Sequence, residues 1–225
     1  MKENPPFKRL FIIEKLKAKE RKENMPRQAR IIPQTGFLHI ICRGNNKRKV
    51  FRYERDKNRY HQYLRDFKLE DKIDIYHYCL MNNHLHLIAG LNQDSNISRF
   101  MKRANLRYFY YYRKKYTYCG HLWQGRFKSK IIDSEEYLIQ CGKYIELNPV
   151  RAGIITYPED FKFSSYNYYA FGRKDLLITE NPLYKDLGLQ QKERQYTYRT
   201  MMLEEDVSEI TTKQLSTHNI LLYNK

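Results

Sequence analysis

The sequence has no long hydrophobic run. Its apolar stretches fall short of the roughly 18–20 residues that a membrane-spanning helix requires, which argues against a helical membrane protein. The N-terminal region has only one short apolar patch, Leu10 to Ile13, and charged residues follow it. Such a patch is too short for the core of a secretory signal peptide. We therefore expect a cytoplasmic protein with no membrane partner.

Cysteine is scarce, and its four residues form no Cys-x-x-Cys pair. They are Cys42, Cys79, Cys119 and Cys141. This dispersed spacing argues against a zinc knuckle. Without a secretion signal, it also argues against a disulfide framework. We expect four reduced thiols that pack in the core or lie on the surface.

Acidic residues are outnumbered, because 42 Lys and Arg stand against 25 Asp and Glu and leave a net charge of +17. Such an excess attracts polyanions, of which nucleic acid is the commonest inside a cell. A basic membrane-surface protein or a ribosome-associated protein would show the same total. The stretch 99–130 combines ten Lys or Arg with ten aromatic residues and has no acid. This composition suits a surface that binds phosphates and stacks unpaired bases.

Hydrophobic periodicity predicts four strands and three helices. The strands are expected at 37–42, 73–80, 84–89 and 127–132, and the helices at about 54–69, 95–115 and 134–148. The order strand-helix-strand-strand-helix-strand-helix predicts an α+β fold. We expect a ferredoxin-like four-stranded antiparallel sheet with helices packed on one face.

Two histidines share one face of the predicted strand 84–89. Side chains alternate along a strand, so His84 and His86 point to one side while Leu85 points to the core. Two imidazoles about 7 Å apart along a strand can bind one metal ion. Taken alone, such a pair is more often a half-exposed polar face than a metal site.

The last predicted helix carries a tyrosine beside its apolar stripe. The stripe that would face the sheet is formed by Leu138, Cys141 and Ile145. Gln140, Tyr144 and Asn148 follow one another at intervals of four and stack along an adjacent strip. A tyrosine next to an amide could lie over a metal bound on the sheet. However, the chain has 21 tyrosines, and spacing alone does not single out Tyr144.

Five motifs together resemble the REP-associated tyrosine transposases, bacterial relatives of the single-tyrosine transposases in the HUH (histidine-hydrophobic-histidine) nuclease superfamily. The matching stretches are R-G-N-N at 43–46, C-L-M-N-N-H-L-H-L-I at 79–88, W-Q-G-R-F-K-S at 123–129, Y-I-E-L-N-P-V-R-A-G at 144–153 and F-S-S-Y at 163–166. They occur in the family's order and cover roughly residues 30–170. Each motif is modest alone, but five in sequence are specific.

The resemblance implies a chemistry for four residues. His84 and His86 match the paired histidines that hold a divalent cation, Mg²⁺ or Mn²⁺. Tyr144 matches the nucleophile, and Asn148 falls where the family places a polar third ligand. The implied reaction is cleavage and rejoining of DNA through a 5′-phosphotyrosine bond. The implied partner is single-stranded or hairpin DNA.

Further residues are predicted to contact DNA. They are Arg43, Arg99, Arg103, Arg107, Trp123, Gln124 and Arg126. Two of these predictions have a structural alternative. Trp123 could simply pack against the sheet, and Arg43 could belong to a turn, which is the interpretation we favour for residues 43–46.

The family pattern would begin near Met25, and the composition changes near Arg173 to Asp175. We therefore expect an N-terminal basic extension at 1–24, a transposase domain at 25–174 and a C-terminal extension at 175–225. The sequence does not decide whether the protein is a monomer or a homodimer. The alternative functions are a non-catalytic protein that binds structured nucleic acid and a replication-initiator-type HUH nuclease. The absence of a second motif tyrosine and the Asn-Pro-Val stretch weigh against the initiator.

Overall fold

The computed structural model describes residues 32–33 and 36–203. The predicted extension 1–24 lies outside the described residues, as do the first residues of the predicted transposase domain and residues 204–225. Among the helices of the described part, none combines the length and the apolar character needed to cross a membrane.

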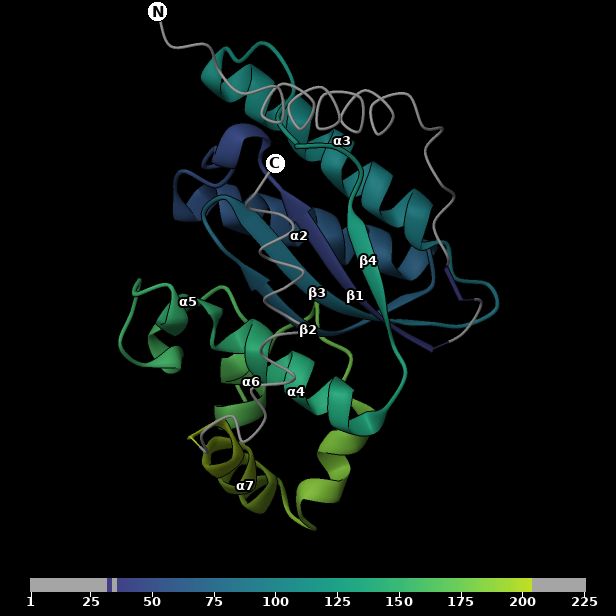
Figure 1. Cartoon of the computed structure of the whole chain (residues 1–225), viewed down its shortest axis with the longest axis vertical. Helices are drawn as coiled ribbons and strands as arrows, with labels where there is room; N and C mark the ends of the chain where they lie inside the picture. Colours follow the sequence, from purple (N-terminus) through teal and green to yellow (C-terminus); the bar gives the residue numbers. More distant parts are fainter. Residues whose placement is uncertain (1–31, 34–35, 204–225) are drawn as a thin grey trace, which may run out of the picture. The chain divides into compact units, whose positions relative to one another are not determined.

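The centre of the fold is a four-stranded antiparallel sheet (Figure 1). Its strands are β1 (Gly36–Arg43), β2 (Ile73–Leu80), β3 (His84–Leu91) and β4 (Lys128–Ile132). They lie in the order β2-β3-β1-β4, and each neighbouring pair is antiparallel. Helix α2 (Glu54–Glu70) connects β1 to β2, and α3 (Ile97–Tyr116) connects β3 to β4. This confirms the predicted ferredoxin-like α+β class.

Alternation along the strands sends apolar side chains to α2 and α3. Leu38, Ile40, Leu85 and Leu87 are fully buried. On the same side of β1, the Cys42 sulfur accepts a hydrogen bond from Asn105 of α3. The two helices pack against each other and against this face, and their inward positions are filled by large buried aromatics such as Tyr60 and Tyr108.

The third long helix, α4 (Glu135–Glu146), covers the opposite face of the sheet. Two neighbours on β2 demonstrate this. Tyr78 packs against His61 of α2, whereas His77 bonds to Glu146 of α4. The predicted placement of helices on one face therefore holds for α2 and α3 but not for α4. Only the two residues 133–134 separate β4 from α4, so the chain folds back over the face that the connecting helices leave open.

Local signals define the ends of α4. The Ser134 side chain accepts a hydrogen bond from the backbone nitrogen of Tyr137, which caps the first turn. The helix ends at Glu146, two residues earlier than predicted, and Leu147 is its C-cap. Proline at position 149 then falls in the first turn of the short helix α5 (Asn148–Arg151), where its missing N–H costs nothing.

The remaining elements follow α5 and pack beside α4. They are the 3₁₀ segments η2 (Pro158–Asp160) and η3 (Pro182–Leu187), with helices α6 (Tyr166–Phe171) and α7 (Gln191–Leu203). A further 3₁₀ segment, η1 (Asn45–Lys47), lies between β1 and α2. Buried tyrosines join the last of these elements: the Tyr184 and Tyr198 rings both contact Tyr169 of α6. The described part of the predicted C-terminal extension is therefore folded.

Candidate active site

Strand pairing brings three histidines together on the face that α4 covers. In the register between β1 and β3, Arg43 lies opposite His84, and Ile41 lies opposite His86. His39 of β1 reaches across the same face, and its Nε2 lies 2.9 Å from Nδ1 of His86. The ring centroids of His84 and His86 are 5.0 Å apart. The predicted pair of histidines therefore belongs to a cluster of three imidazoles.

Burial and charge keep the paired imidazoles neutral. Desolvation, with a contribution from the positive charge of Arg43, lowers the pKa of His84 to about 4. Desolvation also lowers the pKa of His86 well below its usual value, and the neighbouring His84, His39 and Arg43 add to the effect. Neutral imidazoles have a lone pair to donate, so both side chains have the form that a metal ligand requires.

Hydrogen bonds indicate which nitrogen offers that lone pair. The Nδ1 of His84 lies 2.7 Å from the acceptor Oδ1 of Asn83, so this nitrogen carries the proton. If His86 likewise donates from Nδ1 to His39, both histidines keep Nε2 for a metal. A hydrogen bond at the other ring nitrogen is the usual support of a histidine ligand. In the described part of the chain, no three His, Cys, Asp or Glu side chains form a ready metal cage.

Tyr144 lies over this histidine cluster. Its ring centroid is 5.8 Å from that of His86 and 6.5 Å from that of His39, and both pairs meet edge to face. The residue is 9% exposed. The guanidinium of Arg151, from α5, lies 5.3 Å from the tyrosine ring. The residue that the motifs single out is thus in direct contact with one of the paired histidines.

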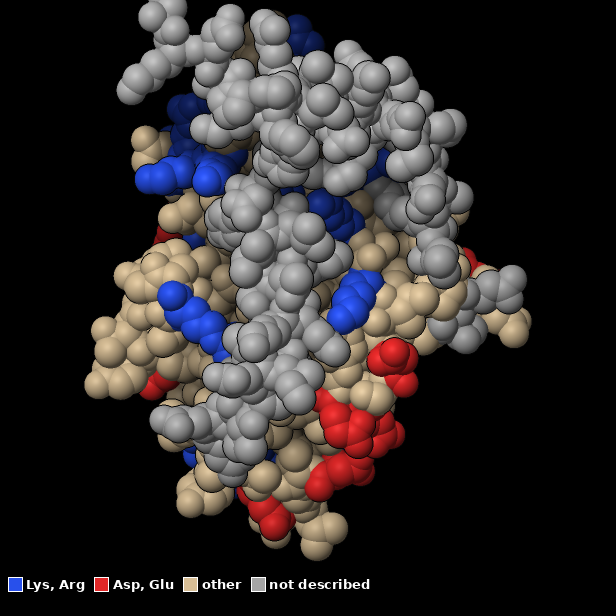
Figure 2. Space-filling model, viewed as in Figure 1, with Lys and Arg blue, Asp and Glu red and all other residues tan. Residues whose placement is uncertain are grey.

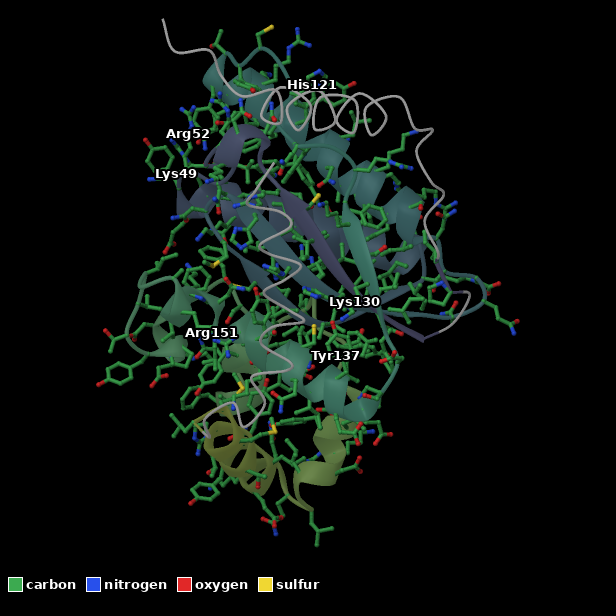
Figure 3. All side chains as sticks on the ribbon, in the orientation of Figure 1. Lys49, Arg52, His121, Lys130, Tyr137 and Arg151 are labelled. Atoms are coloured by element: carbon green, nitrogen blue, oxygen red, sulfur yellow. The ribbon has the colours of Figure 1, made fainter. Side chains whose placement is uncertain are left out.

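Tyr137 lies two turns earlier on the same helix, and its surroundings differ. Its hydroxyl is buried and has no hydrogen-bond partner within the described residues. Burial, with smaller effects from Cys141 and Asp133, raises the pKa of this hydroxyl. The Lys130 ammonium lies 4.5 Å from its ring, and Figure 3 shows the two residues side by side. No histidine ring contact of Tyr137 is found in the described part of the chain.

Asn148 is the first residue of α5 rather than the last of α4. The predicted strip from Gln140 through Tyr144 is therefore interrupted by the C-cap before it reaches Asn148. The Asn148 Nδ2 is buried and has no hydrogen-bond partner in residues 32–33 and 36–203. Its role as a third ligand stays a prediction.

Three of the sequence motifs meet at the end of the sheet next to His84. The backbone nitrogen of Gly44 donates to Asn83 O, that of Asn45 donates to Leu122 O, and that of Gln124 donates to Arg43 O, all within 2.9 Å. A Cβ at position 44 would lie 2.4 Å from Arg48 O, so only glycine fits. Arg43 is the last residue of β1, where it lies beside the histidines, and residues 45–47 form the 3₁₀ segment η1. Contact of Arg43 with DNA stays a prediction.

Trp123 packs inside the protein on the side of α2 and α3. Its Nε1 donates to Asn105 O at 3.1 Å, and its ring lies against those of Phe51, Tyr60 and Tyr108. These contacts favour the packing alternative for Trp123. Gln124 and Arg126, which follow it, are exposed. Contacts of these three residues with DNA stay predictions.

The basic residues at the start of α3 lie away from the histidines. Arg99 and Arg103 form ion pairs with the buried Asp71 at the end of α2, and Arg103 also pairs with Glu70 at 2.5 Å. The guanidinium of Arg107 lies 5.8 Å from the ring of Tyr63. Helix α3 covers the face opposite the histidine cluster, so these arginines join two helices. Their contact with DNA stays a prediction that these pairings do not support.

Two lysines of β4 lie on the histidine face, and the sequence did not single them out. Lys130 is opposite His39 in the pairing of β1 with β4, and Lys128 is opposite Ile41. Residues that face each other across antiparallel strands share a face. Burial and the charge of Arg43 lower the pKa of Lys128. Figure 2 shows Lys and Arg side chains on this side of the molecule, with Asp and Glu gathered below β4.

The sequence pattern also did not identify His39 as a residue of the site. The strand 37–42 was predicted, and alternation could have placed His39 on the face opposite Leu38 and Ile40. The predicted ferredoxin-like fold places β1 beside β3 but does not fix their register, and this register brings His39 close to His86.

Known proteins share this sequence pattern and fold. The family described as IS200-like transposases matches residues 35–148, half of the chain. A Haemophilus influenzae protein assigned as a REP-associated tyrosine transposase is 28% identical over 132 residues, covering 51% of this chain and 74% of the relative. A solved REP-associated tyrosine transposase bound to a REP hairpin has a TM-score of 0.56 and 18% identity, covering 70% of this chain and 93% of that chain. The chain therefore belongs to the family of IS200-like transposases.

Proposed function

We propose that this protein cleaves and rejoins single-stranded DNA at a hairpin substrate, with Tyr144 as the nucleophile. The observation that carries the proposal is the ring contact of Tyr144 with His86 on a sheet face that also holds His84 and His39. The hairpin is supported by the similar REP-associated relatives, one of which was solved with a REP hairpin.

His84 and His86 would hold a divalent cation, Mg²⁺ or Mn²⁺, with Asn148 as the candidate third ligand. Their neutral imidazoles fit this role. Asn148 would bind the ion through its Oδ1, because its amide nitrogen is a hydrogen-bond donor. When bound, such an ion withdraws charge from the scissile phosphate and fixes its orientation. Arg43 beside His84 adds a fixed positive charge that attracts the phosphate.

The covalent step is an exchange of phosphoesters. The Tyr144 oxygen forms a bond to the scissile phosphorus, and the bond to the 3′ oxygen breaks. The phenolic proton leaves, and the departing oxygen gains a proton to become a free 3′-hydroxyl. The phosphate stays on the tyrosine as a 5′-phosphotyrosine. Because one phosphoester replaces another, a second 3′-hydroxyl can reverse the step without ATP.

The direct test is a denaturing gel with hairpin DNA labelled at one end or the other. Attachment through a 5′-phosphate predicts that a 3′-end label migrates with the protein and a 5′-end label migrates as a shorter free strand. Attachment through a 3′-phosphate would give the reverse pattern and contradict the mechanism. Absence of an adduct on every hairpin, with tight binding retained, would favour the non-catalytic binding protein.

His39 should support the metal site without binding the metal. We expect His39→Ala to weaken Mn²⁺ binding by about 10–100-fold, the usual effect of removing the group that orients a histidine ligand. Titration of Mn²⁺ by its electron paramagnetic resonance signal measures this directly. His121→Ala, which changes an exposed histidine on a loop, is the control and should bind Mn²⁺ normally. Unchanged affinity in His39→Ala would contradict this role for His39.

The DNA strand should follow β4 rather than α3. We expect Lys128→Ala combined with Lys130→Ala to flatten the plot of log affinity against log salt by about 1.4, since each lost phosphate contact on a single strand contributes about 0.7. Arg103→Ala should leave this slope unchanged, because its guanidinium pairs with Glu70 and Asp71. Fluorescence anisotropy with a labelled single strand gives both slopes. An unchanged slope in the double lysine variant together with a flatter slope in Arg103→Ala would place the DNA on α3.

A further inference from the structure

Glu146, the last residue of α4, is a buried carboxylate that the proposed chemistry does not use. It is 0% exposed and lies two residues after Tyr144. Its Oε1 is 2.9 Å from Nδ1 of His77 and accepts a hydrogen bond from the hydroxyl of Ser165. Its Oε2 accepts a hydrogen bond from the Tyr198 hydroxyl at 2.6 Å. Three separate segments therefore meet at one carboxylate.

The direction of each hydrogen bond can be assigned. The backbone nitrogen of Leu183 donates to Asn181 Oδ1, which turns the Asn181 Nδ2 toward His77. This amide donates to Nε2 of His77, so the imidazole proton is on Nδ1 and points at Glu146. All three partners of the carboxylate are therefore donors, and the cluster is satisfied only when α4 holds Glu146 at this position.

The geometry of α4 couples Glu146 to Tyr144. Successive residues of an α-helix are about 100° apart, so these two side chains, on either side of Ile145, project about 200° apart. Ile145 is fully buried between them. Tyr144 leans toward β1 and β3, and Glu146 leans toward β2 and the C-terminal elements. A roll of the helix that frees Glu146 would therefore also move Tyr144 relative to the histidines.

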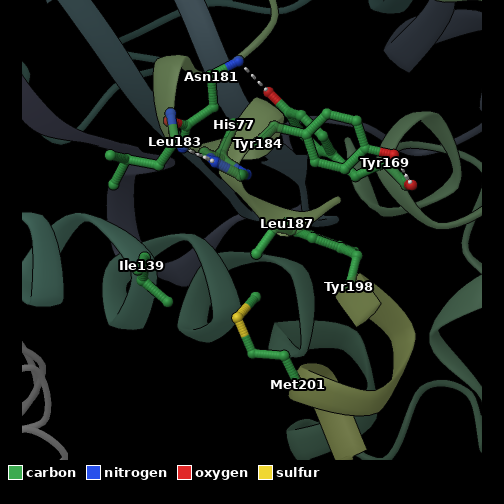
Figure 4. Close-up of a pocket in the computed structure, with 9 residues that line it drawn as sticks. All are labelled: His77, Ile139, Tyr169, Asn181, Leu183, Tyr184, Leu187, Tyr198 and Met201. Atoms are coloured by element: carbon green, nitrogen blue, oxygen red, sulfur yellow. Dashed lines mark hydrogen bonds between the residues drawn. The ribbon is translucent and has the colours of Figure 1, made fainter. Parts of the chain in front are cut away.

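Packing around α4 is incomplete on the side of α7. A cavity of about 30 Å³ lies under α4 and is lined in part by Ile139 of α4, Met201 of α7 and the network residues His77, Asn181 and Tyr198. Figure 4 shows Ile139 and Met201 on facing helices with the hydrogen-bonded side chains beyond them. Side chains that border a void lack contact atoms on that side, so they resist displacement less. On this side of α4, the hydrogen bonds at Glu146 then add to the packing in fixing the position of the helix.

We propose that Glu146 is a positioning residue for Tyr144, and that Tyr198 and Ser165 act through it. Residues 165–198, which lie beyond the family match at 35–148, thereby fix the helix that carries the nucleophile. The motif F-S-S-Y would then help to position Tyr144, because the hydroxyl of its Ser165 donates a hydrogen bond to Glu146, which belongs to the motif that begins at Tyr144. This inference rests on the proposed function of Tyr144.

Tyr198→Phe tests the proposal, because it deletes one hydroxyl and keeps the ring. Tyr78→Phe is the matched control. Tyr78 is 2% exposed against 4% for Tyr198, and its hydroxyl also donates to a carboxylate, that of Asp175, at 2.6 Å. This bond lies on the side of α2, away from α4. Both variants lose a charged hydrogen bond, and we expect similar falls in Tm.

We expect Tyr198→Phe to slow adduct formation about tenfold at saturating hairpin and to leave the hairpin Kd within twofold of wild type. Tyr78→Phe should react at the wild-type rate. Equal rates in all three proteins, or equal slowing in both variants, would overturn the positioning role.

A second measurement is independent of DNA chemistry. Backbone amides of α4 should exchange with deuterium several-fold faster in Tyr198→Phe than in Tyr78→Phe, as measured by mass spectrometry. Absence of any adduct in the wild-type protein would overturn the proposed function alone, and the exchange rates would still decide whether Glu146 fixes α4. Identical exchange of α4 in both variants would overturn the proposal even if the protein cleaves DNA.

Discussion

Replacing Tyr144 with phenylalanine should abolish the covalent protein–DNA adduct while hairpin binding stays close to that of wild type. The change removes the hydroxyl that would attack phosphorus, and no other group in the site can form the same bond. Loss of a nucleophile in other enzymes lowers the rate by several orders of magnitude, so we expect a fall on the order of 10⁴-fold or more. Adduct formation with 3′-end-labelled hairpin measures it.

The fold should tolerate this change. The phenylalanine ring fills the same volume and keeps the edge-to-face contacts with His86 and His39, so Tm should change little. Tyr137→Phe is the control, since it alters the other tyrosine on this face of α4, two turns earlier. It should form the adduct normally. An adduct that persists in Tyr144→Phe and disappears in Tyr137→Phe would move the nucleophile to Tyr137.

Local pattern predicted the parts of this site that depend on local geometry. Period-two alternation placed His84 and His86 on one face of a strand, and the apolar stripe of the last helix placed Tyr144 at the edge of the buried side. Both rules concern residues only a few positions apart. The structure agrees with the placement of these residues, and their chemical roles stay predictions.

The contacts that the sequence did not predict join residues far apart in the chain. The pairing of His39 with His86 spans 47 positions, and that of Tyr198 with Glu146 spans 52. Such contacts depend on strand order and on which face a helix covers, and neither is encoded in a short window. The same reason explains Arg99, which appeared free for DNA in a segment without acids but pairs with Asp71, 28 positions earlier.

Loss of either paired histidine should stop the reaction almost completely. A metal ion bound at the scissile phosphate contributes several kcal/mol of transition-state stabilisation, so we expect His84→Ala and His86→Ala each to slow adduct formation by about 100-fold or more. EDTA should stop the wild-type protein, and added Mg²⁺ or Mn²⁺ should restore it. Nitrogen ligands favour Mn²⁺ over Mg²⁺, so Mn²⁺ should restore activity at the lower concentration.

The two substitutions should differ in their effect on stability. His86 is buried at 1% exposure and bonds to His39, so His86→Ala leaves a cavity and removes one hydrogen bond of His39. It should therefore lower Tm by several degrees more than His84→Ala. Rates are therefore compared at a temperature where both variants are folded, with His121→Ala as the control. A stable His84→Ala protein that cleaves at the wild-type rate, or full cleavage by the wild type in EDTA, would show that the histidines do not act through a metal. The cluster would then be a structural feature of the sheet, and Tyr144 would need another source of charge neutralisation. Arg151, whose guanidinium lies 5.3 Å from the Tyr144 ring, and Arg43 beside His84 are the candidates.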